Sequence, residues 1–199
     1  MARKPRRADT LPDLNEIESE MSQVRSKGKF RQALKGTIGT FIVVAALAVI
    51  VAFIFLPVLR ITNGHNMEPG FQPGDIVLLT KSDEVNNGEI CAFYFNNKLL
   101  LRRVIAREGD TVEIDEKGYV KVNGEFLEED GYISEHALGQ CDIDFPFRVQ
   151  AGQFFVLGDN RDYAFDSRAT NFGCVSQEEI YGKPMARIYP FDRFAWFGF

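Results

Sequence analysis

The chain has 199 residues, of which 45% are hydrophobic, and its 28 acidic side chains outnumber its 23 basic ones, so the net charge is −5. This acidity argues against a nucleic-acid partner, because proteins that bind nucleic acids present a basic face to the phosphates. The three cysteines are too few for a disulfide framework, and the two histidines come without any paired-cysteine spacing. We therefore expect no metal site and no cofactor.

Residues 37–59, TIGTFIVVAALAVIVAFIFLPVL, form an apolar run without an ionisable side chain. At about 1.5 Å per residue, a helix of this length crosses a hydrocarbon core of roughly 30 Å. A buried core helix is the alternative, but such helices rarely run so far without a charge. The run also starts far from Met1 and no small-x-small cleavage site follows it, so we interpret it as an uncleaved transmembrane helix rather than a signal peptide.

The charges on either side of this run predict its orientation. Residues 1–36 carry nine basic and five acidic side chains, whereas residues 61–199 carry thirteen basic and twenty-three acidic ones. Basic flanks stay in the cytoplasm. We therefore expect a single-pass plasma-membrane protein in contact with membrane lipid, with residues 1–36 as a cytoplasmic basic tail and residues 60–199 as an extracytoplasmic domain.

Beyond Arg60, short apolar runs separated by turn residues predict a domain that is mainly β, arranged as a barrel or a sandwich. Hairpin turns are expected at Asn96-Asn97 and at Lys117-Gly118, where the residues tolerate a positive φ. The polar stretch 125–149 is interpreted as a surface insertion. The aromatic C-terminus, residues 189–199, is expected either to rest in the membrane interface or to form the last core strand. The expected strands are 76–80, 90–95, 99–106, 111–114, 119–122, 154–157 and 180–189.

Three segments, in this order, resemble segments of the type I signal peptidases, membrane-anchored serine peptidases that remove signal peptides from exported proteins. They are GHNMEP at 64–69 with QPGDIVLL at 72–79, RRVI at 102–105 with GDTV at 109–112, and GDNRDYAFDSR at 158–168. The resemblance implies a signal-peptidase-like β fold. It also implies a Ser/Lys dyad, in which a serine attacks the peptide carbonyl and a neutral lysine takes its proton.

The residues at the reacting positions differ from that family pattern. The resemblance places the nucleophile at Asn66, whose amide nitrogen is not nucleophilic, and the base at Arg102, whose guanidinium keeps its proton. The serine that orients the base is replaced by Ala164. We expect no catalytic residue, and we interpret Asn66 and Arg102 as compatible replacements that share a hydrogen bond. The residues expected to shape the peptide groove or brace its loops are Met67, Pro69, Arg103, Asp159, Asn160, Arg161, Asp166, Ser167 and Arg168.

Our main hypothesis is therefore a signal peptidase I-like membrane protein that has lost proteolysis and binds an extended peptide as an added strand. Resemblance to a family with inactive members, some of them associated with pilus assembly, implies a chaperone or adaptor role for exported or pilin-type proteins. One alternative is an active signal peptidase I, a serine endopeptidase with an unrecognised dyad, such as His65 with Thr62 or Ser167. The other is a purely structural membrane protein.

Overall fold

The computed structural model describes residues 34–51, 57–62, 64–82 and 84–197. The chain divides into two units, Met1–Ala52 and Phe53–Phe199. The described part of the first unit is one helix, Leu34–Val51, with a mean hydropathy of 2.2. This helix is long and apolar enough to cross a membrane. The predicted basic tail lies outside the described residues, apart from its last three positions.

The C-terminal end of the predicted membrane span differs from the prediction. Val58 and Leu59 belong to β1 (Val58–Arg60), which pairs with β2 (Ile76–Lys81) in antiparallel register, and the helix is described only up to Val51. The residue before the strand is Pro57. A proline has no N–H to donate and disfavours the helical conformation in the residue before it, so an extended chain is favoured here.

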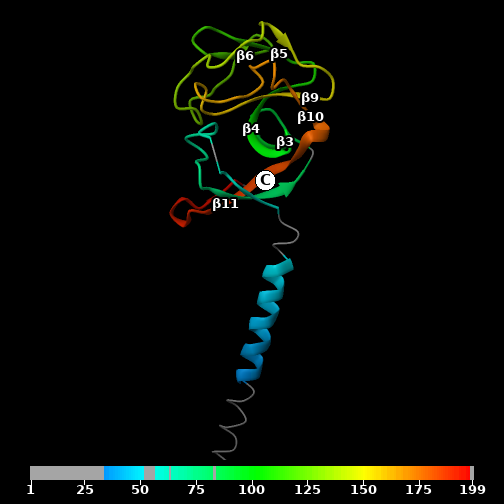
Figure 1. Ribbon diagram of the computed structural model, residues 1–199, viewed down its shortest axis with the longest axis vertical. Helices are drawn as coiled ribbons and strands as arrows, with labels where there is room; N and C mark the ends of the chain where they lie inside the picture. Colours follow the sequence, from blue (N-terminus) through cyan, green and yellow to red (C-terminus); the bar gives the residue numbers. More distant parts are fainter. Residues whose placement is uncertain (1–33, 52–56, 63, 83, 198–199) are drawn as a thin grey trace, which may run out of the picture. The chain divides into compact units, whose positions relative to one another are not determined.

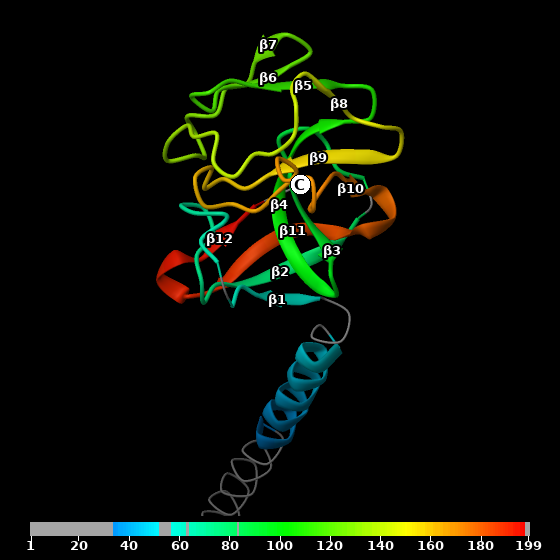
Figure 2. The ribbon, with the colours of Figure 1, turned by 45° about the horizontal axis from the view of Figure 1, so that its top comes forward.

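Most strands of the second unit form one antiparallel sheet of eight strands. Its order is β1-β2-β11-β3-β4-β9-β10, with β12 beside β11 (Figures 1 and 2). In Figure 2 the long β4 runs from near β1 to the neighbourhood of a second sheet. The remaining strands of the large sheet are β3 (Ile90–Phe95), β4 (Lys98–Arg107), β9 (Gln153–Leu157), β10 (Val175–Ser176), β11 (Ile180–Tyr189) and β12 (Ala195–Trp196).

The second sheet has four strands in the order β7-β6-β5-β8. Its strands are β5 (Thr111–Ile114), β6 (Val120–Val122), β7 (Glu125–Phe126) and β8 (Phe147–Arg148). Val112 of this sheet packs in one buried apolar cluster with Ile105 of β4 and Phe155 of β9. The mainly β prediction is confirmed. The described strands form two open sheets, however, and neither sheet closes into a barrel.

Every strand expected from the sequence is present, with ends shifted by at most one residue. Both predicted hairpin turns are confirmed by their backbone angles, since φ is 48° at Asn96, 61° at Asn97 and 85° at Gly118. The strands that the sequence did not indicate, β1, β7, β8 and β10, are two or three residues long. Such short strands carry too few residues to show a period-two pattern.

The structure shows the surroundings of two segments for which the sequence indicated no definite secondary structure, residues 125–149 and the aromatic C-terminus. Within residues 125–149, β7 and β8 join the small sheet, and Glu129 and Val149 are buried while many of the residues between them are exposed. At the C-terminus, β12 pairs with β11, yet Phe191 and Trp196 are 82% and 60% exposed. The aromatic segment therefore forms a short strand with exposed rings at Phe191 and Trp196, whereas the ring of Phe197 contacts the buried Phe71 with ring centroids 5.1 Å apart.

Candidate functional site

A groove of about 480 Å³ lies beside β1 and the first half of β4. Strand β1 is the edge of the large sheet. The first half of β4, Lys98–Arg102, pairs only with β3, because the pairing of β4 with β9 begins at Arg103. Among the described residues, β1 and the first half of β4 thus each have one edge that no strand pairs with, and such edges bind extended peptides by adding them as a further strand.

The walls of the groove are formed by apolar side chains that belong to the buried core. Met67 and Leu101, each 4% exposed, line it together with Phe71, and all three belong to one buried cluster. Leu99 packs against the same cluster from β4. Pro69, which the sequence placed with the groove, is exposed and does not line it. The groove therefore offers apolar contacts next to free strand edges.

Asn66 lies in the groove, where its side chain and its backbone hold the segment 158–165. The backbone N–H of Phe165 donates to Asn66 Oδ1 at 3.3 Å, and the N–H of Asn160 donates to the Asn66 carbonyl at 3.0 Å. The backbone at Gly158 passes so close that a Cβ there would lie 2.5 Å from the Asn66 carbonyl oxygen and would also clash with the buried Ala164. Only glycine fits at this position without movement of its neighbours.

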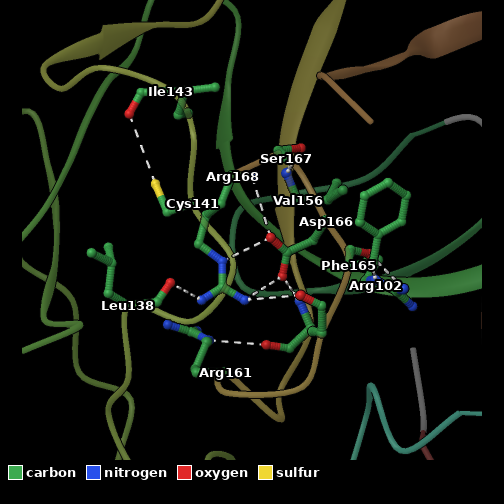
Figure 3. A network of polar contacts seen from close by, with 12 residues as sticks. Arg102, Leu138, Cys141, Ile143, Val156, Arg161, Phe165, Asp166, Ser167 and Arg168 are labelled. Carbon is green, nitrogen blue, oxygen red and sulfur yellow. Dashed lines mark hydrogen bonds and ion pairs between the residues drawn. The ribbon is translucent and has the colours of Figure 1, made fainter. Parts of the chain in front are cut away.

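Arg102 lines the same groove but is only 4% exposed. Its Nε and Nη2 donate to the carbonyl of Phe165 at 3.1 and 2.7 Å (Figure 3). Its Nη1 donates to the Leu101 carbonyl at 2.6 Å. Burial lowers the pKa of Arg102 to about 10, with the charge of Asp166 acting against this. The guanidinium therefore remains charged at neutral pH and cannot accept a proton there.

Asn66 and Arg102 hold the same residue rather than each other. In the described part of the chain their side chains share no hydrogen bond, so the expected direct bond between them is not formed. Instead, Asn66 accepts the N–H of Phe165 and Arg102 donates to its carbonyl. The two replacements are compatible through the backbone of this one residue, whose N–H and carbonyl they engage separately, and sequence spacing alone could not identify it.

The loop that carries Phe165 is braced by a buried ion pair. Asp166 binds Arg168 at 2.8 Å and also accepts the N–H of Gly158 at 2.9 Å. Arg168 reaches across to the carbonyl of Leu138 at 2.6 Å (Figure 3). Ser167 Oγ accepts the N–H of Val156 at 3.0 Å, so this hydroxyl is fixed in the core. These contacts place Asp166, Ser167 and Arg168 in a structural network.

A second buried pair joins this loop to the segment between β7 and β8. Arg161 donates to Glu129 at 2.5 and 3.2 Å, and its Nε donates to the carbonyl of Gly158 at 2.9 Å. Sequence reasoning missed Glu129, because it lies in the stretch interpreted as an insertion and belongs to none of the matching segments. Beside it, Arg103 binds Asp159 through two hydrogen bonds of 2.8 and 2.6 Å. Burial raises the pKa of Asp159, and this pairing with Arg103 acts against the rise.

The other polar groups near the groove do not form a Ser/Lys-like pair. His65 binds Glu68 at 2.7 Å and meets the ring of Tyr163 edge-on, with ring centroids 5.6 Å apart. Lys98 and Thr62 line the groove. Among the described residues, neither His65 nor Lys98 is hydrogen-bonded to a hydroxyl group.

Comparison with known proteins places this geometry in a family. The family described as "Signal peptidase, peptidase S26" matches residues 34–189. Signal peptidase IB of Staphylococcus aureus (strain COL) is 30% identical over 184 residues, which span 81% of this chain and 94% of the relative. Signal peptidase I of Bacillus licheniformis is 28% identical over 184 residues, spanning 86% of this chain and 97% of that protein.

A solved structure of a signal peptidase I from Enterococcus faecalis V583 is 30% identical, covering 50% of this chain and 96% of that chain with a TM-score of 0.41. The family match extends from the apolar helix to the end of β11, and the relative from Staphylococcus aureus aligns over nearly its whole length. The chain therefore belongs to the signal peptidase family, peptidase S26.

Proposed function

We propose that this chain is a membrane-anchored member of the signal peptidase family that binds an extended peptide of an exported protein in its groove without hydrolysing it. The observation that carries the proposal is the way in which Asn66 and Arg102 are engaged. Both side chains hold the backbone of Phe165, at the two positions where the family resemblance expects a nucleophile and a base.

Hydrolysis by a dyad requires a hydroxyl that attacks and a neutral group that takes its proton. Asn66 has no hydroxyl, and its amide nitrogen is delocalised into the carbonyl. Arg102 keeps its proton, since its pKa of about 10 leaves it charged at neutral pH. The position that would orient the base is Ala164, which is buried and has no polar side-chain atom. The proposed loss of hydrolysis follows from these three side chains.

Peptide binding does not need any of these groups to react. The unpartnered edge of Lys98–Arg102 can pair with a peptide backbone, and the walls formed by Met67, Phe71 and Leu101 can contact its side chains. The proposed partners are exported proteins, including those of the pilin type, for which the chain would act as a chaperone or adaptor. The helix Leu34–Val51 is proposed to anchor it, with the basic N-terminal residues in the cytoplasm.

A second candidate function is hydrolysis by a different set of residues. The pair His65–Glu68 favours it, because a carboxylate at 2.7 Å can orient an imidazole that acts as a general base. His65 is exposed and directly precedes Asn66 in the chain. Thr62, which lines the groove, is the accessible hydroxyl nearest to it in sequence.

The first experiment separates these functions by direct assay. Purified full-length protein in detergent micelles is mixed with a preprotein that carries a small-x-small cleavage site, and we expect the preprotein to stay intact. Cleavage at that site would refute the proposed loss of hydrolysis. If such cleavage disappears in His65→Ala but persists in the surface control Glu128→Gln, the second candidate function is correct.

The second experiment tests whether the scaffold around the replaced positions is intact. The combined variant Asn66→Ser, Arg102→Lys, Ala164→Ser is expected to cleave the same preprotein. Its matched control is Asn66→Ala, Arg102→Met, Ala164→Ser, which disrupts the same contacts without supplying a nucleophile or a base. Equal inactivity of two folded variants would mean that the groove does not present a peptide to these positions.

A further inference from the structure

The charged side chains that line the groove all have the same sign. They are Arg60, Lys98 and Arg102, and no acidic residue lines the groove in the described part of the chain. This contrasts with residues 61–199 as a whole, where twenty-three acidic side chains face thirteen basic ones. An extended ligand in this groove therefore meets a local excess of positive charge.

The most buried of these three cations lacks a counter-ion. Arg102 donates only to backbone carbonyls, and no carboxylate in the described residues lies within ion-pair distance of it. The nearby Asp166 is held by Arg168 and by the N–H of Gly158. A buried charge without a carboxylate partner is costly, so a bound anion would stabilise it.

Unused donors accompany this charge. Each terminal nitrogen of the Arg102 guanidinium carries two hydrogens and makes one hydrogen bond, to Leu101 from Nη1 and to Phe165 from Nη2. Asn66 uses its Oδ1 as an acceptor, while its Nδ2 has no hydrogen-bond partner in the described residues. Arg102 and Asn66 thus combine a positive charge with free N–H groups in one groove.

The pairing of β4 shows where a docked strand has to stop. A peptide paired with the free edge of Lys98–Arg102 meets β9 at Arg103, whose strand partner on that side is Leu157. The edge is occupied from that point on, so the peptide cannot continue as a strand past Arg102. A peptide that ends where the ladder stops places its terminus beside the guanidinium of Arg102, which repels an ammonium group and attracts a carboxylate.

We propose that the groove binds peptides through a free C-terminal carboxylate, which accepts hydrogen bonds from Arg102 and from Asn66 Nδ2. This inference rests on the proposed function and specifies its ligand class as a peptide end rather than an uninterrupted chain. The rest of the peptide pairs with the edge of β4 and contacts Leu99 and Leu101. Lys98 and Arg60 lie along the groove and do not bind the terminal carboxylate.

The first test needs no variant of the protein. Full-length protein in micelles is titrated with the fluorescein-labelled peptide Leu-Ala-Val-Ala-Leu-Ala, either with a free C-terminal carboxylate or with a C-terminal amide. Charge-assisted hydrogen bonds to a buried guanidinium predict that the acid binds about tenfold to a hundredfold more tightly than the amide. Equal affinity of the two peptides overturns the inference.

Two variants assign the effect to its residue. In folded Arg102→Met the acid-to-amide affinity ratio is expected to fall to about one, whatever the absolute affinity of the amide. The matched control Lys98→Met removes a different groove cation and should keep the acid-to-amide ratio. A ratio that survives in folded Arg102→Met, or that vanishes in Lys98→Met instead, contradicts the assignment.

Two further measurements distinguish failure of this inference from failure of the proposed peptide binding on which it rests. The variant Leu99→Arg fills the groove and should abolish binding of both peptides. If the acid and the amide bind equally and both lose binding in Leu99→Arg, carboxylate recognition is refuted but peptide binding in the groove is supported. If neither peptide binds the unmodified protein, both proposals are refuted. An amidated peptide that ends in glutamate and binds as tightly as the acid would assign the site to a side-chain carboxylate and refute the C-terminal one.

Discussion

The buried pair of Glu129 and Arg161 links the segment between β7 and β8 to the loop that carries the candidate site, and its removal is the most informative perturbation of the fold. The side chains of Glu129 and Arg161 are 0% and 1% exposed, and they share two hydrogen bonds of 2.5 and 3.2 Å. Glu129→Gln keeps the shape of the side chain but leaves the Arg161 charge buried without its partner.

The expected loss of stability is large because the remaining guanidinium cannot reach water. Breaking a buried ion pair from one side destabilises a protein by about 3–5 kcal/mol. For a domain of this size, that corresponds to a melting temperature lowered by roughly 10 °C or more. The conservative substitution Glu128→Gln, at the exposed neighbouring residue, should change stability by less than about 0.5 kcal/mol.

Thermal unfolding followed by circular dichroism of both variants gives the comparison. If Glu129→Gln melts within a degree or two of Glu128→Gln, the pair does not stabilise the fold and the reasoning is wrong. The double variant Glu129→Leu, Arg161→Met provides a second check, because it leaves no unpaired charge. It is expected to be more stable than Glu129→Gln, although it loses the hydrogen bond from Arg161 to Gly158.

Three other predictions concern single positions. Asn97→Val should destabilise the protein by roughly 1–2 kcal/mol in denaturant unfolding, because φ is 61° at this residue. Asn97→Gly should not destabilise it, and equal stability of the two variants would contradict the assigned turn. In the same denaturant unfolding, Gly158→Ala should lower stability by about 1–3 kcal/mol, because the added Cβ would lie 2.5 Å from the Asn66 carbonyl oxygen. Gly70→Ala is the control that should be tolerated, because a Cβ there would lie 3.5 Å from its nearest neighbour. Burial raises the pKa of Cys91 to about 12, so the folded state keeps a proton that the unfolded chain loses from about pH 9. The stability that this thiol contributes below pH 9 is lost as pH rises to 12, by about 1.4 kcal/mol per pH unit, and the alkaline unfolding curve of Cys91→Ala should be correspondingly flatter.

Local sequence was sufficient where a single strand or turn determines the structure. The runs at 90–95 and 180–189 show strand composition over their whole length, and the structure places strands at the same residues. The turn at Asn96-Asn97 could be identified because few residues other than glycine and asparagine adopt a positive φ. Two-residue strands such as β7 arise only from pairing with a neighbour, so composition does not reveal them.

The contacts of the candidate site could not be predicted in the same way. The positions of Asn66 and Arg102 were visible from the motifs, but their common partner is the backbone of Phe165, which any residue type could supply. Glu129 is likewise an ordinary acidic residue in a polar stretch until tertiary folding buries it against Arg161. The sequence therefore indicated which positions belong to the candidate site, but not which groups their side chains contact.

The proposed loss of the dyad and the retention of the groove are physically independent in this fold. The free edge of β4 exists because β9 begins to pair only at Arg103, and this depends on strand register rather than on the side chain at position 102. The loop opposite is fixed by the Asp166–Arg168 pair, and in the described part of the chain neither side chain of this pair is hydrogen-bonded to Asn66 or Arg102. A change at positions 66 and 102 can therefore remove a nucleophile and a base while the walls and edges that bind a peptide stay in place. Since Asn66 accepts the N–H of Phe165 and Arg102 donates to its carbonyl, replacing only one of them leaves one of these two backbone groups without its side-chain partner, so we expect hydrolysis only in a variant in which both positions change together.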